Sequence, residues 1–334
     1  MKKLFSILFF MVCFPFADLQ ANPTPRVYFV LWNGCEEACR GFLDYLKASH
    51  EKIDVVRRDL NQQTDKIPEI ISEIKELSPD LLVTWGTLAS VKILGTGNSG
   101  PVSEYGTIPA LFMVVSQPVE SGLVSSMVSQ GRNITGVTHL VSLPEQLQSA
   151  RQVMTFDKLG VVYNPREVNA QETVNQLRQY AKLMNFELLE RPVALSKNKQ
   201  PSAESIPSLV ADLADNNTDL IYLGPDAFMN ANRKALIETA TSFSIPVFSA
   251  SEGAVRHDNA LFAFVHRYYT VGQMAGKKAL QILKDKTQAY DIPIESPQRS
   301  LFVVNMTAAK KNGVFPPMTL LQNADMINLP SSKN

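Results

Sequence analysis

The chain has 334 residues, 45% of them hydrophobic, with 32 basic and 32 acidic side chains. That length predicts two domains, or one bilobed protein. A charged fraction of 19% excludes a disordered chain and a polytopic membrane protein. Because the formal net charge is zero, the electrostatic footprint of a general nucleic-acid binder is missing, and we expect no nucleic-acid partner. The composition indicates a soluble, mixed α/β protein.

The N-terminus has the pattern of a secretory signal peptide at residues 1–21. Two lysines precede an apolar run at 4–16, and Ala21 supplies a small residue at the expected cleavage site. The run is too short to span a bilayer comfortably. A lipoprotein would use Cys13 as the lipidated residue, but the bulky Val12 in front of it argues against lipid anchoring. We therefore expect a periplasmic protein.

Strands and helices alternate through the first half of the mature chain. Runs rich in β-branched and aromatic residues predict the strands, and apolar residues on one helical face predict the helices. The expected strands are 26–31, 52–59, 80–85 and 108–115, with helices after Asn33, at 67–77 and at 88–94. Near-continuous apolar strands in this order are typical of a parallel, doubly wound sheet.

A second series of the same kind follows residue 144. Its expected strands are 158–163, 186–191, 219–223 and 245–249, with helices around 174–184, at 206–213 and around 231–241. The sequence therefore predicts two doubly wound parallel-sheet lobes with a hinge near 138–144. Ligands of parallel sheets bind at the carboxyl ends of the strands, and two lobes imply a cleft between them. We expect a clamp that closes by a hinge motion.

Cys35 and Cys39 are the cysteines of the mature chain, in a C-x3-C pattern. On a helix this spacing puts both sulfurs on one face, near the upper end of disulfide reach. A bridge across the first helical turn and two free thiols are both compatible with the sequence. A redox-active pair would more usually be C-x-x-C, and a metal site would need further ligands.

The stretch 95–100 matches the dinucleotide pattern G-x-G-x-x-G letter for letter. That fingerprint has to follow a strand and open a helix, whereas this stretch follows a helix-like run and ends at Pro101, so we interpret it as a surface loop. The chain has no G-x-S-x-G elbow, no phosphate loop and no metal-ligand spacing among its four histidines. The sequence therefore predicts neither an enzyme nor a cofactor.

Polar and aromatic residues follow the predicted strands of both halves. Gly and Thr before a helix offer backbone N–H groups to a carboxylate, and aromatic rings offer a stacking face. Taken singly, such residues also cap helices and form turns without any ligand. Because all these turns are expected to face one cleft, we predict that they form a ligand site. The candidates are Trp32, Asn33, Trp85, Gly86, Thr87, Ser116, Gln117, Tyr163, Asn164, Asp226, Ser249 and Glu252.

At these turns the sequence resembles the ABC-transporter substrate-binding proteins, a family that includes tryptophan- and tyrosine-binding members. The most specific matching piece is G-x-N-[IV]-T-G-V, which is GRNITGV at 131–137. The other pieces run through most of the mature chain: DLLVTWGT at 80–87, SQPV at 116–119, GVVYNP at 160–165, YLGPD at 222–226, YYTVG at 268–272 and NMTAAK at 305–310.

The resemblance implies a type I periplasmic-binding fold whose chain crosses between the lobes more than once. Lobe 1 would contain residues 26–138 and 266–286, and lobe 2 would contain residues 144–264 and 292–330. The helix after Tyr268 would return to lobe 1, and the strand 299–305 would return to lobe 2. By the same resemblance the cleft would be lined by Gly86, Thr87, Ser116, Tyr163, Asn164 and Asp226.

One departure from the family bears on the ligand. Where the family often has Gly-Pro-Asp before Tyr-Tyr, this chain has Val265-His266-Arg267. A carboxylate there would suit a ligand ammonium, whereas Arg267 would favour a carboxylate, a phosphate or another anion. The alternative is that Arg267 turns outward and pairs on the surface. Asp226 and Glu252 remain as partners for an ammonium.

Together these features predict an exported solute-binding component of an ABC import system. It would bind an amino-acid-like or small anionic molecule between its lobes, act as a monomer and hand the ligand to a membrane permease. Two alternatives stay open at this stage. One is a periplasmic ligand-sensing module for a membrane receptor, and the other is an enzyme on the same fold.

Overall fold

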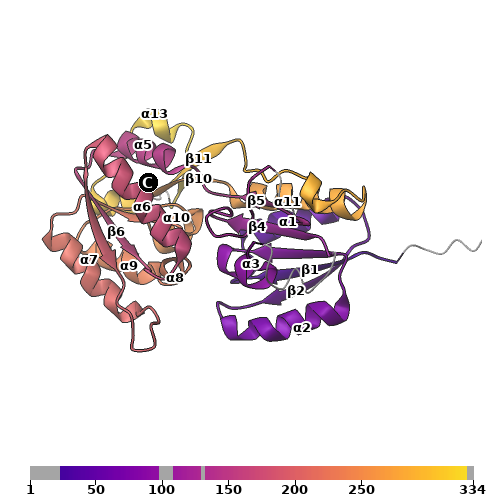
Figure 1. Cartoon of the computed structure of the whole chain (residues 1–334). Helices are drawn as coiled ribbons and strands as arrows, with labels where there is room; N and C mark the ends of the chain where they lie inside the picture. The colour runs from indigo at the N-terminus through magenta and orange to yellow at the C-terminus, as the bar shows by residue number, and fades with distance from the viewer. Residues whose placement is uncertain (1–22, 98–107, 129–131, 329–334) are drawn as a thin grey trace, which may run out of the picture.

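The computed structural model describes residues 23–97, 108–128 and 132–328, which form two α/β lobes side by side (Figure 1). The expected signal peptide at 1–21 lies outside these residues, as do residues 98–100 of the glycine-rich motif and the last residues expected for lobe 2, 329–330. In the described part of the chain, no helix combines the length and the apolar character that a membrane crossing needs.

The sheet of lobe 1 has five parallel strands in the order β2-β1-β3-β4-β5. Every residue of β3, β4 and β5 is buried, as a parallel sheet covered on both faces requires. The sequence did not lead us to expect β5. The strands are β1 (Arg26–Leu31), β2 (Asp54–Asp59), β3 (Leu81–Trp85), β4 (Ala110–Val115) and β5 (Ile134–Thr138).

Helices cover both faces of this sheet. Phe29 of β1 belongs to the core beneath α1 and α11, whereas Tyr28 belongs to the opposite core beneath α2 and α3. The alternation follows from the two-residue period of a strand. The helices of lobe 1 are α1 (Glu37–Ala48), α2 (Ile67–Leu77), α3 (Thr87–Leu94) and α11 (Tyr268–Leu283), with short 3-10 helices at Thr64–Lys66 and Ala289–Asp291.

The sheet of lobe 2 has seven strands in the order β12-β11-β10-β9-β8-β6-β7. We expected parallel strands throughout, but β11 runs antiparallel to β10, with Ser300 opposite His266. The chain enters β11 from lobe 1, at the hinge end where β10 stops, so it has to run the other way. The strands are β6 (Lys158–Tyr163), β7 (Glu187–Pro192), β8 (Leu220–Leu223), β9 (Val247–Ser249), β10 (Phe262–His266), β11 (Ser300–Asn305) and β12 (Asp325–Ile327).

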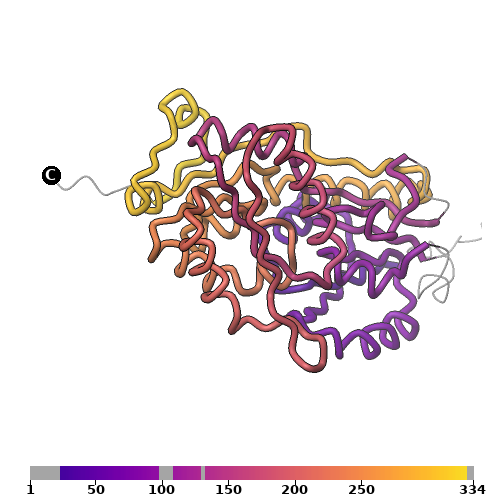
Figure 2. The backbone as a smooth tube through the Cα atoms, turned by 60° about the vertical axis from the view of Figure 1, so that its left-hand side comes forward, coloured from indigo at the N-terminus to yellow at the C-terminus, as the bar shows by residue number. Residues whose placement is uncertain are grey.

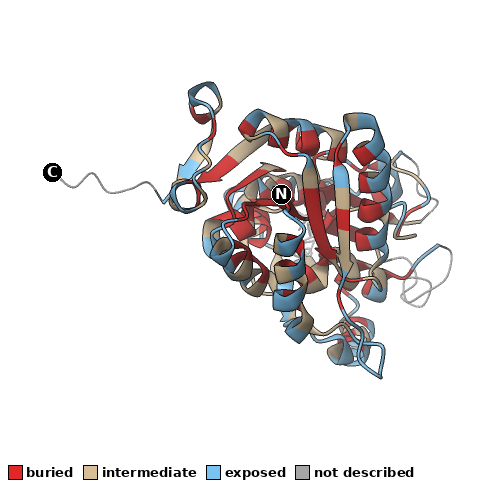
Figure 3. Cartoon of the chain, turned by 90° about the vertical axis from the view of Figure 1, so that its left-hand side faces the viewer, coloured by how far each residue is buried: buried red, intermediate tan, exposed pale blue. Residues whose placement is uncertain are grey.

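Two cores also flank the sheet of lobe 2, one under α5, α6 and α12 and the other under α7, α9 and α10. Figure 3 shows buried residues on the strands and on the inner sides of the helices. The helix expected around 231–241 is α9, which follows a short α8 after a break at Asn232. The helices of lobe 2 are α5 (Leu143–Val153), α6 (Val168–Met184), α7 (Ile206–Asp215), α8 (Ala227–Ala231), α9 (Arg233–Ser242), α10 (Glu252–Asp258), α12 (Met306–Asn312) and α13 (Met318–Leu321), with a 3-10 helix at Ala203–Ser205.

The chain crosses between the lobes after β5, after β10 and again before β11. In Figure 2 the orange segment that contains α11 lies with the indigo lobe, and the yellow segment returns to the other lobe. The last crossing comes later than the expected boundary at 292, because Ile292 and Ile294 are buried in the cores of lobe 1. Thr138 N–H donates to the carbonyl of Glu295 over 2.9 Å, which adds this segment to the edge of β5.

Candidate functional site

A cavity of about 440 Å³ lies between the two lobes. Its walls come from the segments that follow all five strands of lobe 1 and from those that follow β6, β8 and β9 in lobe 2. Both sheets therefore point their carboxyl ends at one space, which is where parallel α/β sheets bind ligands. Eight of the thirteen predicted site residues line it: Trp32, Asn33, Trp85, Gly86, Thr87, Ser116, Asp226 and Glu252.

The lobe 1 wall combines aromatic rings with the start of a helix. Trp85 is 8% exposed, and its indole Nε1 finds no hydrogen-bond partner among the described residues. Gly86 has a φ of +91°, and a Cβ there would lie 3.3 Å from Cβ of Trp32, so the turn favours glycine. Helix α3 begins at the next residue, Thr87, without a side-chain cap. Its first N–H groups are therefore available to an acceptor in the cavity.

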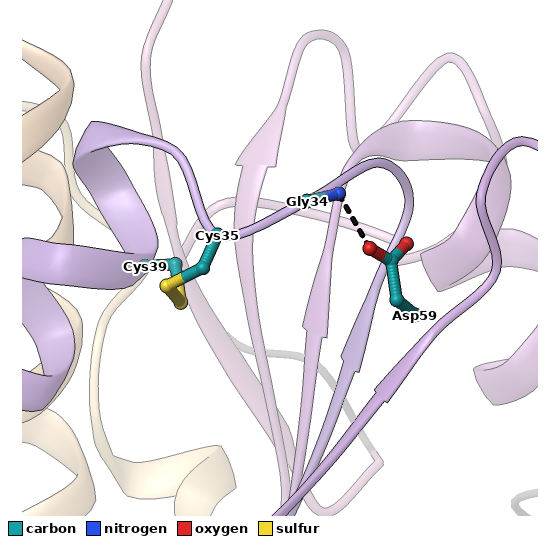
Figure 4. The surroundings of a disulfide bond; sticks show 4 residues. All are labelled: Gly34, Cys35, Cys39 and Asp59. Carbon is teal, nitrogen blue, oxygen red and sulfur yellow. Dashed lines mark hydrogen bonds between the residues drawn. A yellow bond between two sulfur atoms is a disulfide. The ribbon is translucent and has the colours of Figure 1, made fainter.

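A disulfide joins Cys35 to Cys39 beside this wall, which settles the choice that the sequence left open. Figure 4 shows the bridge between the two residues. Cys35 lines the cavity, while Cys39 is fully buried in α1. Gly34 N–H donates to Oδ2 of Asp59 over 2.8 Å, which ties the same loop to the end of β2. Both links restrain the loop that carries Trp32, so the ring is held in place before any ligand arrives.

Two carboxyl groups line the cavity on the lobe 2 side. Asp226 is 4% exposed and caps α8, where its Oδ1 accepts from Met229 N–H over 2.8 Å. Glu167, the residue before α6, accepts from the N–H groups of Ala227 and Phe228 over 2.8 and 2.9 Å. Both side chains line the cavity and interact with each other. Burial and the adjacent Glu167 carboxylate raise the pKa of Asp226 to about 8.

Further charged residues, which sequence reasoning missed, line the cavity between the walls. Glu36 precedes α1, and burial raises the pKa of its carboxyl, while Arg233 and His257 across the cavity lower it. The signal was present in the sequence, because Glu36 follows Asn33 by three residues just as Glu167 follows Asn164. Extending each strand-end turn to the first residue of the next helix would have found both acids.

Five predicted site residues do not line the cavity. Asn164 lies beneath it, and its backbone N–H donates to Oδ2 of Asp226 over 2.6 Å. Ser249 is fully buried and accepts from Ser251 N–H over 3.1 Å. Tyr163 packs on the core of lobe 2, and Gln117 is also away from the cavity wall. The fifth residue is Arg267.

Arg267 turns away from the cavity and pairs on the surface, which is the second of the two possibilities that the sequence left open. Its side chain is 52% exposed, and Nη2 lies 3.4 Å from Oδ2 of Asp325 on β12. Its neighbour at Asp325, Arg256, does line the cavity, and it bonds to Glu252 over 2.9 Å and to Asp325 over 2.5 Å. Glu252 in turn accepts from Tyr268 N–H over 2.9 Å, so it links α10 to the start of α11 at the crossing.

Two buried histidines lie at the crossings next to the cavity. His139 follows β5 and is 5% exposed, and its ring stands edge-on to that of Tyr268 with centroids 5.2 Å apart. Burial, together with the nearby His266, lowers the pKa of His139 to about 3. Burial also lowers the pKa of His266. Both side chains are therefore uncharged at neutral pH.

No group of three or more His, Cys, Asp and Glu side chains suited to a metal ion exists within residues 23–97, 108–128 and 132–328. The hydrogen-bond donors of lobe 1 and the carboxyl groups of lobe 2 instead offer contacts for a small organic molecule. Two α/β lobes with a cavity between them form the type I periplasmic-binding-protein fold.

The family within this class follows from the sequence. Residues 27–328 match the family model described as ABC transporter substrate binding protein, and the chain belongs to that family. A tyrosine-binding protein of Clostridioides difficile (strain R20291) is 29% identical over 204 residues, which are 61% of this chain. The matched part is 56% of that relative, so the chain spans little more than half of its length.

Solved structures share the fold over 91% of this chain and 99% of theirs. A conserved domain protein of Vibrio cholerae has a TM-score of 0.78 at 22% identity. An ABC domain of Streptococcus pneumoniae in complex with L-Trp also has a TM-score of 0.78, at 18% identity. A ligand-free, open substrate-binding protein with adhesive properties from Clostridium difficile has a TM-score of 0.68 at 22% identity.

Proposed function

We propose that this protein is the exported, periplasmic solute-binding component of an ABC import system. It binds a small amino-acid-like molecule between its lobes and delivers it, as a monomer, to a membrane permease. Family membership supports the transport role, and the chemistry of the cavity supports the ligand class. The proposal assigns no chemical step to the site.

The observation that carries the ligand class is the opposite character of the two cavity walls. Gly86, Thr87 and Leu88 at the start of α3 suit a ligand carboxylate. Asp226 and Glu167 in the facing lobe suit a ligand ammonium. A zwitterion with both groups on one carbon joins the walls and thereby draws the lobes together.

The aromatic rings beside the carboxylate end favour an aromatic side chain. Trp32 and Trp85 both line the cavity, and Trp85 offers its unpartnered Nε1–H to the ligand. The relatives named for tyrosine and crystallised with L-Trp support the same class. We therefore choose L-tyrosine and L-tryptophan as the first ligands to test.

Thermal unfolding with a ligand panel tests the proposal. A ligand that binds the folded state at a hundredfold excess over its Kd stabilises it by about 2.7 kcal/mol. We expect a raised Tm with L-tryptophan or L-tyrosine and a smaller rise with tryptamine, which lacks the carboxylate. The ligand class is wrong if both amino acids leave the Tm unchanged while another solute raises it.

A matched pair of variants locates the binding site. Trp85→Phe removes the indole N–H but keeps a ring, so it should weaken amino-acid binding. Because Trp85 is buried in the core of lobe 1, the smaller ring should also lower the unliganded Tm. Tyr290→Phe also removes one polar group from a ring, but Tyr290 is 45% exposed and does not line the cavity. The Tyr290→Phe variant should bind the amino acid with wild-type affinity in calorimetric titrations.

A further inference from the structure

We infer that the cationic group of the bound solute replaces a proton that Asp226 and Glu167 share in the ligand-free protein, so that binding releases a proton to solvent. The inference rests on the proposed function, because it concerns the ammonium half of the same site. It adds a regulation that the fold by itself does not imply, namely a ligand affinity that rises with pH.

The geometry holds the two carboxyl groups together. Asp226 accepts from the backbone N–H groups of Asn164 and Met229 over 2.6 and 2.8 Å. Glu167 accepts from two backbone N–H groups of α8, and its Oε1 also accepts from Nδ2 of Asn164 over 3.1 Å. Asn164 therefore bonds to both carboxyl groups, and neither can swing away without losing backbone bonds.

No cation offsets this pair in the described part of the chain. No lysine, arginine or histidine there forms an ion pair with Asp226 or Glu167 (salt bridges within 4.0 Å). Two adjacent carboxylates in a low-dielectric site repel each other, so a single shared proton lowers the energy of the pair. The raised pKa of Asp226 agrees with this arrangement.

The other charged groups that line the cavity come from both lobes. The acids there are Glu36, Glu37 and Glu252, and the bases are Arg40, Arg233, Arg256 and His257. Glu252, Arg233 and Arg40 already have partners in Arg256, Asp258 and Glu37. No side-chain cation of the described residues therefore neutralises the two carboxyl groups. In the ligand-free protein a bound proton reduces their negative charge, and in the complex the ligand ammonium takes its place.

Two unpartnered polar atoms mark the same space as a ligand site. Nε1 of Trp85 and Nδ1 of His139 lack hydrogen-bond partners among the described residues, and their side chains are 8% and 5% exposed. Both residues line the cavity that contains Asp226. Buried polar groups without partners are rare in proteins, and a bound molecule is one way to satisfy them.

The exchange balances in charge. The ligand-free pair carries one proton and one negative charge. When the ammonium binds, the proton leaves for solvent, and two carboxylates with one ammonium again carry one net negative charge. The carboxyl pair and its cation thus keep one net negative charge, whereas binding without proton release would leave only one of the two carboxyl groups ionised to bond to the ammonium.

Calorimetric titration with L-tryptophan and L-tyrosine, in buffers of different ionisation enthalpy near neutral pH, tests the inference. The slope of the observed heat against the buffer enthalpy counts the protons exchanged. We expect release of about one proton per ligand, because one proton is shared by the coupled pair. Indole-3-lactate, which has a hydroxyl in place of the ammonium, should release none.

Variants locate the source of the proton. Asp226→Asn has no proton to release, so the slope of observed heat against buffer enthalpy should fall to about zero. Its affinity for the amino acid should be lower by roughly tenfold or more, as when one member of a buried charge pair is removed. Asp215→Asn is the matched control, because Asp215 is exposed on the same lobe and does not line the cavity. It should keep the wild-type slope and affinity.

The outcomes separate the inference from the proposed function. Binding of either amino acid with no proton release would overturn the inference and leave the proposed function intact. If neither L-tryptophan nor L-tyrosine binds, a measurement on the ligand-free protein still tests the inference. The infrared difference spectrum of wild type minus Asp226→Asn should show the C=O stretch of a protonated carboxylic acid at neutral pH. Its absence would overturn the inference whatever the ligand is.

Discussion

Two arginines of lobe 2 reach the same carboxylate and have different roles. Arg256 lies between Glu252, which is 3% exposed, and Asp325, at distances of 2.9 and 2.5 Å. Arg267 approaches Asp325 only to 3.4 Å from an exposed position. An exposed pair of this kind contributes little to stability, whereas a buried carboxylate that loses its partner is costly.

Substitution of the two arginines should therefore give different results. Arg256→Gln should lower the free energy of unfolding by about 2–4 kcal/mol, because Glu252 keeps only the Tyr268 N–H bond. Arg267→Gln should change it by less than about 0.5 kcal/mol and leave ligand affinity unchanged. Urea unfolding and calorimetric titration measure both effects. A large loss of affinity in Arg267→Gln would restore Arg267 to the ligand site.

The buried His139 predicts how stability depends on pH. Its pKa is lowered to about 3 in the folded protein by burial, so below the ordinary histidine pKa of about 6.5 only the unfolded state takes up the proton. Stability is therefore lost as the pH falls from about 6.5 toward about 3, by at most about 1.4 kcal/mol per pH unit. His139→Gln should flatten the dependence of Tm on pH over this window.

His50→Asn is the control for that measurement. His50 is exposed and has a φ of 59°, a conformation that asparagine tolerates. Its variant should keep the wild-type slope. The opposing contribution of Asp226, whose raised pKa costs stability as the pH rises toward about 8, cancels when each variant is compared with wild type. An unchanged slope in His139→Gln would show that His139 binds its proton as readily in the folded state as in the unfolded state, and so that burial does not lower its pKa.

At the scale of elements, the contact between α1 and α11 holds the second crossing on lobe 1. A Cβ on Gly41 would lie 2.1 Å from the carbonyl oxygen of Tyr269, and one on Gly272 would lie 1.9 Å from that of Ala38. Glycine on both helices therefore lets the two backbones touch. The same contact places Tyr268, the first residue of α11, at the cavity wall.

Gly272→Ala should separate these helices and lower the free energy of unfolding by about 3 kcal/mol, the upper end of the usual cost of overpacking. Gly253→Ala in α10 is the matched control, because the nearest atom to its Cβ would be 3.8 Å away. That variant should be neutral, or more stable by about 0.5–1 kcal/mol, as for Gly→Ala within a helix. Chemical denaturation compares them, and equal stabilities would contradict the close packing.

At the scale of the whole molecule, a ligand that joins both walls should make the protein more compact. Saturating L-tryptophan or L-tyrosine should reduce the radius of gyration in small-angle scattering, because the lobes move as rigid bodies about the crossings. Asp226→Asn at a concentration that leaves it unliganded should keep the larger value. An unchanged radius in the ligand-saturated wild type would exclude a closing hinge.

Local patterns are enough to predict most of the elements. Helix α2 and strand β6 have the predicted bounds, because apolar periodicity and flanking breakers act within the element itself. The antiparallel β11 could not be predicted in this way. Its direction depends on where the chain re-enters lobe 2 after α11, and that depends on contacts between segments far apart in the sequence.

The sequence by itself determined the two-lobed α/β class and indicated that strand-end turns of both lobes would line the cavity between them, because both follow from local periodicity and from the geometry of parallel sheets. Only the tertiary structure decided which turn residues face the cavity. It turned Arg267 outward to Asp325 and brought Glu167 against Asp226. Both outcomes depend on a partner from another element, and no residue pattern along the chain specifies that partner.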